Sequence, residues 1–88
     1  MNPFAVILTP EARSDILRLD STIQTRILNR LAWMGENAEL LRHQVLQGNR
    51  WRGCYRYRLG AYRIIYLLDQ SNRRLTVLKV GHRRDVYG

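Results

Sequence analysis

Residues 51–87 read WRGCYRYRLGAYRIIYLLDQSNRRLTVLKVGHRRDVY, and this stretch decides the fold. Short runs rich in Tyr, Ile, Val and Leu are separated by Gly60-Ala61 and by residues 69–72, which have the composition of turns. Runs of this length that are joined by such short turns form antiparallel strands. The stretch therefore predicts an antiparallel meander.

The first of these runs alternates strictly between apolar and basic side chains. Cys54, Arg56 and Arg58 are expected to point to one face of the sheet, and the residues between them to the other. Residues two apart on a strand lie about 6–7 Å apart on the same face, so Arg56 and Arg58 form a cationic pair. Arg63 follows on the next strand, across the tight turn. The tyrosines of these strands are assigned to the covered face, and they are Tyr55, Tyr57, Tyr62 and Tyr66.

The beginning of the chain has the pattern of a strand followed by a helix. Residues 4–8 (FAVIL) form a continuous apolar run, which predicts a strand buried on both faces. Thr9 can then cap a helix that begins at Pro10 and carries Glu11 in its first turn. The apolar side of this helix is expected to consist of Ala12, Ile16, Leu17 and Leu19.

A second amphipathic helix is expected after residues 20–22, which can cap it, and Gly35 is expected to end it. Its apolar stripe consists of Ile23, Ile27, Leu28, Leu31 and Ala32. Residues 36–49 are less regular and predict a short helical turn followed by a linking strand.

These elements together predict one α+β domain that comprises residues 1–88. A two-helix hairpin covers an antiparallel sheet of three to four strands, and the N-terminal strand joins the sheet at an edge. Trp33 and Trp51 are assigned to packing, Cys54 has a structural role, and His43 receives no role.

Charge is distributed very unevenly along the chain. The 88 residues carry a net charge of +8, and the isoelectric point is about 10.8. Residues 1–41 hold four arginines against five acidic residues, whereas residues 42–88 hold ten arginines and Lys79 against two acidic residues, a net of +9. Repulsion of this size destabilises a compact domain and is relieved by nucleic acid, acidic lipid or acidic protein. The planar fork of arginine suits phosphate, so the composition favours nucleic acid.

Other features of the composition restrict the class of protein. The single cysteine, Cys54, excludes an internal disulfide and offers no metal cluster, so neither a metal nor another cofactor is expected. No apolar run approaches the about 18 residues of a membrane span, and the N-terminus lacks a signal-peptide pattern. A cytoplasmic protein without a membrane partner is therefore expected.

Several segments together resemble the RelE/ParE toxin superfamily, and the RelE branch most closely. They are the order strand–helix–helix–meander, Leu46-Gln47-Gly48, GCYRYRLGAYRIIY at residues 53–66 and VGHRRDVY at residues 80–87. The resemblance implies the RelE-like microbial RNase fold and a toxin of a type II toxin–antitoxin operon. Toxins of that branch enter the ribosomal A site and cut messenger RNA, and an acidic antitoxin encoded alongside holds them inactive.

The resemblance also places roles on individual positions of this sequence. Catalytic roles fall on Arg56, Arg58, Arg63, Arg83 and Tyr87. His82 lies beside this set, at a position that is often basic in the family, and is a candidate for proton transfer. Contacts with the message or with ribosomal RNA are assigned to Arg50, Arg52, Arg73, Arg74, Lys79 and Arg84.

Cutting RNA without a metal requires the 2′-OH to attack the adjacent phosphate. Arg63 and Arg83 are the candidates that stabilise the developing negative charge. Some relatives carry Lys where this chain has Arg56 and Arg58, and arginine is not deprotonated in proteins. Three alternatives for the proton transfer stay open: Arg56 only orients the ribose and stabilises charge, Tyr87 or His82 moves protons, or the ribosome supplies the geometry.

Two other functions compete with the nuclease hypothesis. A ParE-like inhibitor of DNA gyrase would share the scaffold, although that branch does not need the full basic set and Tyr87. A nucleic-acid-binding module without catalysis ranks last, because the chain has no helix-turn-helix or RNA-reading aromatic signature. The resemblance further implies that operator DNA is bound only through the antitoxin.

Overall fold

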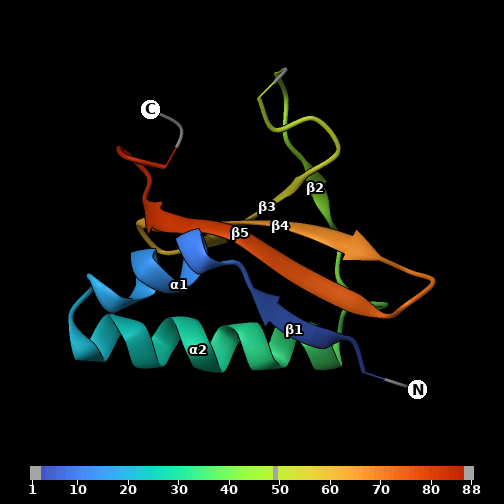
Figure 1. Cartoon of the computed structure of the whole chain (residues 1–88), viewed down its shortest axis with the longest axis horizontal. Coiled ribbons are helices and arrows are strands. Elements are labelled where there is room, and N and C mark those ends of the chain that lie inside the picture. The colour runs from blue at the N-terminus through green and yellow to red at the C-terminus, as the bar shows by residue number, and fades with distance from the viewer. Residues whose placement is uncertain (1–2, 49, 87–88) are drawn as a thin grey trace.

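The computed structural model describes residues 3–48 and 50–86, and it has the predicted α+β outline (Figure 1). The elements in chain order are β1 (Ala5–Leu8), α1 (Pro10–Leu17), α2 (Ser21–Glu36), β2 (Gln44–Val45), β3 (Tyr55–Leu59), β4 (Tyr62–Asp69) and β5 (Arg74–His82). They form a five-stranded sheet in the order β1-β5-β4-β3-β2. β1 pairs parallel with β5 at one edge, and the four strands β2–β5 pair antiparallel. The predicted meander and the N-terminal edge strand are confirmed.

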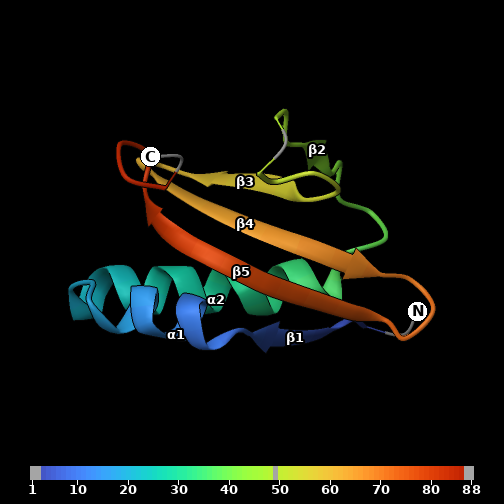
Figure 2. The same ribbon diagram turned by 45° about the horizontal axis from the view of Figure 1, so that its top comes forward.

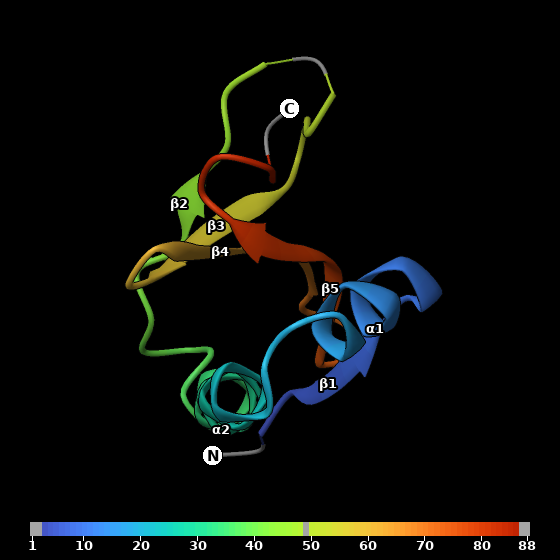
Figure 3. The ribbon, with the colours of Figure 1, turned by 90° about the vertical axis from the view of Figure 1, so that its left-hand side faces the viewer.

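Both helices lie on one side of the sheet, which we call the helical face (Figure 2). The main core fills the space between the helices and the strands, and Figure 3 shows how the sheet curves around it. Its buried residues are Phe4, Ala12, Ile16, Ile27, Leu31, Met34, Ala38, Ile64, Tyr66, Leu75, Val77 and Val80. The predicted covered face of β3 is confirmed, because Tyr55, Tyr57 and Leu59 pack against this core. None of the described helices is long and apolar enough to cross a membrane.

The start of α1 follows the prediction, since the Thr9 hydroxyl accepts a hydrogen bond from the Ala12 amide at 3.2 Å. Three assignments of apolar residues on the helices were wrong, and one of them is Ala32 of α2, which is exposed. Leu17, at the last position of the short α1, is 68% exposed, and Leu28 on the outer side of α2 is 47% exposed. Met34, outside the predicted stripe, is fully buried instead.

Gly35 does not end the second helix as predicted. It lies inside α2, where β1 passes so closely that a Cβ atom would be 2.7 Å from the Phe4 carbonyl oxygen and 2.8 Å from Val6 Cγ2. The Phe4 amide also donates a hydrogen bond to the Gly35 carbonyl at 2.8 Å. This glycine is required by close packing between α2 and β1.

The prediction that residues 4–8 are buried on both faces was also wrong. Along β1 the residues alternate between exposed and half-buried, and Ile7 is 39% exposed. β1 is an edge strand whose second face is not covered by a helix, so within β1 only Val6 and Leu8 pack against the core, next to the buried Phe4 that precedes the strand.

The side of the sheet opposite the helices, here called the open face, carries a second and smaller core. Cys54, Ile65 and Val86 are buried there, and Leu46, Trp51 and Leu78 pack against them. A register shift opposite Ile65 and Tyr66 leaves Leu78 as the extra residue of a β-bulge. The segment before β3 and the turn after β5 therefore both fold onto the open face, and Figure 1 shows them rising from the same side of the sheet.

Candidate functional site

Three arginines form a row on the open face, which we call the basic row: Arg56 and Arg58 of β3 and Arg63 of β4. Arg58 lies directly opposite Arg63 in the antiparallel register, and Arg56 lies opposite Ile65. Like charges that face each other across strands destabilise a sheet. The fold therefore carries a cost at this position that packing does not explain.

The guanidinium of Arg63 is fixed to the turn that joins β3 and β4. Its Nη1 donates hydrogen bonds to the carbonyl oxygens of Gly60 and Tyr62, both at 2.8 Å. Gly60 has φ +59 at the first central position of this two-residue turn, a conformation that favours glycine. Arg63 is only 8% exposed, so it is a fixed charge at the rim of the open face.

Arg83 is held at the same end of the sheet. Its amide donates a hydrogen bond to the Ala61 carbonyl at 2.8 Å, while its side chain is exposed. The turn then closes back, since the amides of Asp85 and Val86 both donate to the His82 carbonyl. The chain thus brings Arg83 next to the turn that fixes Arg63. Tyr87 lies outside the described residues.

No carboxylate neutralises these four arginines within the described part of the chain. The ion pairs found there are Arg18–Asp15, Arg73–Glu39 and Lys79–Glu11. The same part of the chain contains no group of three or more His, Cys, Asp or Glu side chains that could hold a metal ion. The open face can therefore hold an anion through guanidinium groups.

The chain matches the family described as "ParE toxin of type II toxin-antitoxin system, parDE" over residues 6–87. It belongs to this family of the RelE/ParE superfamily. The toxin is 29% identical over 85 residues to Toxin RelG of Mycobacterium tuberculosis, and the match covers 97% of both chains. It is therefore a RelE-like type II toxin.

Solved structures agree with this assignment. A chain of the toxin–antitoxin complex RelBE2 from Mycobacterium tuberculosis superposes with a TM-score of 0.84, at 27% identity, and the match covers 97% of each chain. The archaeal RelE–RelB complex from Pyrococcus horikoshii gives 0.74 at 22% identity, covering 97% of this chain and 100% of that one. The isolated RelE toxin of E. coli gives 0.72 at 21% identity, covering 90% and 83%. The last two likenesses show the shared fold.

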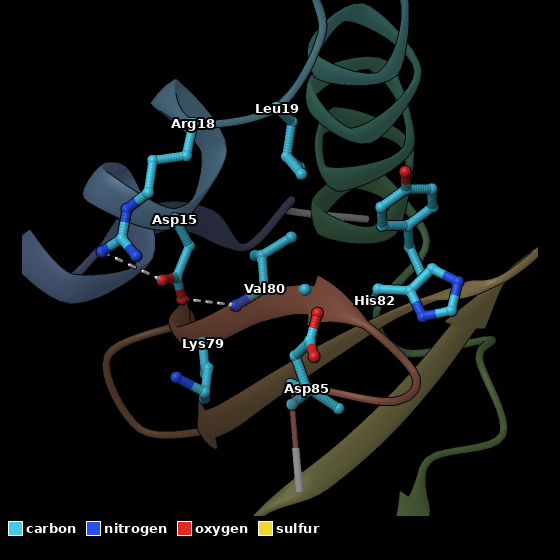
Figure 4. A pocket seen from close by; sticks show the side chains of 10 residues that line it. Asp15, Arg18, Leu19, Lys79, Val80, His82 and Asp85 are labelled. Carbon is cyan, nitrogen blue, oxygen red and sulfur yellow. Dashed lines mark hydrogen bonds and ion pairs between the residues drawn. The ribbon is translucent and has the colours of Figure 1, made fainter. Parts of the chain in front are cut away.

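His82 of the toxin does not lie in the basic row. Its ring packs edge-on against Tyr62 with centroids 5.7 Å apart, and its Nδ1 accepts a hydrogen bond from the Arg84 amide at 3.2 Å. Tyr62 is the strand neighbour of Arg63 and therefore points to the opposite side of β4. Both rings line a hollow of about 280 Å³ between α1 and the end of β5, together with Asp15 (Figure 4).

The six basic residues assigned to RNA contacts fall into separate groups. Arg50 and Arg52 lie in the segment that folds onto the open face, and the Arg50 guanidinium stacks over the Trp51 ring at 5.2 Å. Arg84 is exposed in the turn after β5. These three lie on the two segments that fold onto the open face, and Arg50 lines a hollow together with Arg56 of the basic row.

The other three lie farther from it. Arg73 pairs with Glu39 and stacks over Phe4 at the distant β4–β5 turn, where Arg74 begins β5. Lys79 Nζ lies 3.5 Å from Glu11 Oε1 of α1. Arg73 and Arg74 are not brought to the basic row. Lys79 lies opposite Ile65, the β4 residue between it and Arg56, but its ammonium group lies beside Glu11.

Sequence reasoning gave no role to three residues just before and within β2. His43 Nε2 donates to the Ala38 carbonyl at 2.7 Å, which leaves Nδ1 to accept from the Tyr66 hydroxyl at 2.5 Å. Gln44 lies opposite Arg56, and its Oε1 accepts a hydrogen bond from Arg56 Nη2 at 3.4 Å. Arg42 lines the same hollow as Gln44 and Arg56. These contacts become visible only when β2 is paired with β3. A strand of two residues is too short to show a periodic pattern in the sequence, so this pairing could not be predicted.

Proposed function

We propose that this toxin is a metal-independent endoribonuclease that cuts messenger RNA in the ribosomal A site and so inhibits translation. The observation that carries the proposal is the pairing of Arg58 with Arg63 on the open face, without a neutralising carboxylate among the described residues. A small domain gains nothing in stability from two like charges placed opposite each other. An RNA phosphate between them would remove the repulsion.

The proposed reaction is an internal transfer within the RNA. The 2′-oxygen attacks the adjacent phosphorus and loses its proton, the bond from phosphorus to the 5′-oxygen breaks, and that oxygen gains a proton. The products are a 2′,3′-cyclic phosphate and a free 5′-OH. Negative charge gathers on the phosphoryl oxygens in the transition state, where a fixed donor typically contributes about 3–4 kcal/mol. Arg63, immobilised by its two bonds to the turn, and Arg58 and Arg83 are the donors we assign.

We assign Arg56 to orientation of the ribose rather than to proton transfer, because its guanidinium stays protonated. The Arg56 side chain is held by Gln44, which suits that role. The position of His82 against Tyr62 argues against direct proton transfer by this imidazole. We therefore propose Tyr87, assigned by resemblance, for the proton, with geometry supplied by the ribosome, and expect slower chemistry than in a relative with Lys.

We propose that the toxin binds an acidic antitoxin when it is not on the ribosome. Relatives of this chain have been solved as RelBE2 and RelE–RelB toxin–antitoxin complexes. A carboxylate-rich segment laid over the basic row would exclude RNA, and its binding should weaken with salt. Contact with operator DNA would run through that antitoxin. A ribosomal target places the toxin's action in the cytoplasm.

The test is induction of Arg83→Gln beside Arg13→Gln, which removes the same charge from exposed α1. We expect wild type and Arg13→Gln to arrest growth and to produce new 5′ ends on translated messages, mapped by primer extension. Loss of one transition-state donor should slow cutting by Arg83→Gln about 10²–10³-fold. Tyr87→Phe should also lose toxicity while still binding the antitoxin.

The alternative is a ParE-like inhibitor of DNA gyrase, which the description of the matched family favours. Its signature would be growth arrest with an activated DNA-damage reporter and no new 5′ ends. That result in the wild type would replace the nuclease proposal.

A further inference from the structure

A second feature of β3 lies at its outer edge, next to the basic row. Leu59 and Tyr62 flank a two-residue turn, so they form a hydrogen-bonded pair, and the pairs alternate from there along the strand. Arg58 and Arg63 therefore form a non-hydrogen-bonded pair, so the N–H and C=O groups of Arg58 point away from β4. Cys54 is in the same phase as Arg58, and its carbonyl accepts a bond from the Leu46 amide at 3.0 Å. The phase of the ladder is thereby fixed.

No strand of the described chain pairs with Arg58 on this outer side. β2 pairs with β3 only at Gln44 opposite Arg56 and Val45 opposite Tyr55. His43, the residue before Gln44, points instead to the helical face, where its ring bonds with the Tyr66 hydroxyl and the Ala38 carbonyl. These two bonds lead the chain away from the edge of β3, so the peptide groups of Arg58 remain open.

The gap that results is a hollow of about 250 Å³. It is lined by Arg42, Gln44, Arg56, Tyr57 and Arg58. Three of the five side chains are guanidiniums, and no carboxylate lines the hollow. Gln44 Oε1 accepts a bond from Arg56 Nη2 and so holds this guanidinium at the edge. Guanidinium forks and an outward N–H are the donors that a phosphate group accepts.

We infer that this hollow is a phosphate subsite for the RNA backbone, completed by Arg42 and positioned by Gln44. It rests on the proposed function, because it assigns a further phosphate of the same RNA, next to the scissile one. Arg58 belongs both to the hollow and to the basic row, so a ligand in the hollow is continuous with one between Arg58 and Arg63. A chain with regularly repeated phosphates can fill both places at once.

The test uses the full-length toxin and a hexanucleotide RNA with 2′-O-methyl riboses, which lacks the attacking hydroxyl. Its affinity is measured by fluorescence anisotropy over a series of salt concentrations. Arg42→Gln should weaken binding about tenfold at low salt, as for loss of one charge-assisted contact. The slope of log affinity against log salt should fall by about 0.7, the value for one phosphate of a single strand. Arg42→Lys should retain most of that slope.

Arg13→Gln is the matched control, since it removes an equal charge from exposed α1, and it should leave affinity and slope nearly unchanged. Equal effects of Arg42→Gln and Arg13→Gln would overturn the inference, as would a wild type without affinity for the hexanucleotide at low salt. A hexaglutamate peptide is measured in parallel. If Arg42→Gln weakens the peptide but not the RNA, the hollow is a site for acidic protein and the inference is wrong. Cutting of messages on ribosomes by the wild type is scored separately, so the proposed function can fail or stand independently.

Discussion

The two faces of the sheet are made by alternate residues of the same strands, yet one face is packed and hydrogen-bonded whereas the other carries unneutralised charge. On the helical face of β3 and β4, Tyr55 and Tyr66 pack together around His43, and the bonds of this imidazole are satisfied. On the open face of the same two strands, Arg58 lies directly opposite Arg63 without a counter-charge in the described chain. Because side chains alternate along a strand, a small domain can place its stabilising core on one face of the sheet and unneutralised arginines on the other. Changes on the helical face should lower stability, and changes on the open face should lower function.

The largest loss of stability is expected from Ile64→Ala on the helical face. Ile64 is fully buried in the main core, directly opposite Tyr57, and its truncation leaves a cavity that neighbouring side chains cannot close. We expect a loss of about 2–5 kcal/mol in the free energy of unfolding. Urea denaturation followed by circular dichroism measures it. The variant to compare is Arg58→Gln, which lies on the open face next to Tyr57 in β3. A similar loss of stability for Arg58→Gln would contradict the expected difference between the two faces.

A smaller loss is expected from Gly35→Ala, where α2 meets β1. The added Cβ would lie 2.7 Å from the Phe4 carbonyl oxygen and 2.8 Å from Val6 Cγ2, so β1 must shift. We expect about 1–3 kcal/mol of destabilisation, as for overpacked sites. Gly81→Ala is the matched control on the open face, because its Cβ would meet Val86 at an ordinary 3.8 Å. Equal melting temperatures for the two variants would contradict the close packing at Gly35.

Gly35 also shows where prediction from the sequence ends. Periodicity located both helices and the meander, because each depends on neighbours a few residues away in the chain. By the same local rules a glycine at position 35 predicts the end of a helix. The structure instead requires glycine there because β1, about thirty residues earlier in the chain, packs against α2 at this point, and only the tertiary fold brings the two together. The burial of β1 was misjudged for the same cause, since an apolar run does not reveal whether a strand is central or at an edge.

The candidate site divides in the same way. Alternation alone placed Arg56 and Arg58 on one face, and the short turn brought Arg63 opposite Arg58. The edge hollow with Arg42 depends on how residues before β2 depart from β3, which no local pattern encodes. The position of His82 beside Tyr62 depends on the register of β5 against β4, which is set across a β-bulge.

Tyr66→Phe should sharpen the comparison through its dependence on pH. Removing the hydroxyl leaves the part-buried Nδ1 of His43 without its partner, which should cost about 1–3 kcal/mol at neutral pH. Burial, and then the neighbouring Tyr55 and Tyr57, raise the pKa of Tyr66 above its ordinary value. The folded state therefore favours the neutral phenol, and the stability that this provides is present below the unfolded pKa of about 10 and declines as the pH rises beyond it.

The urea midpoint of the wild type should accordingly fall more steeply above pH 10 than that of Tyr66→Phe. Tyr57→Phe is the control, because this half-buried tyrosine packs on the same face but takes no part in the bond to His43. Parallel curves for wild type and Tyr66→Phe would show that the phenol is not held neutral by its surroundings.

The smallest effect on stability is the most informative about the open face. Arg58→Gln removes one of two like charges that lie directly opposite each other, so it should raise the free energy of unfolding by about 0.2–1 kcal/mol. The glutamine keeps much of the aliphatic stem, and the urea slope should stay unchanged. Arg13→Gln removes an equal charge from α1 and should change stability less. A variant that folds more stably than the wild type while cutting no message would show that Arg58 is kept at a cost in stability. A destabilised Arg58→Gln would instead mean that this arginine stabilises the sheet, and the repulsion that motivates the nuclease proposal would be absent.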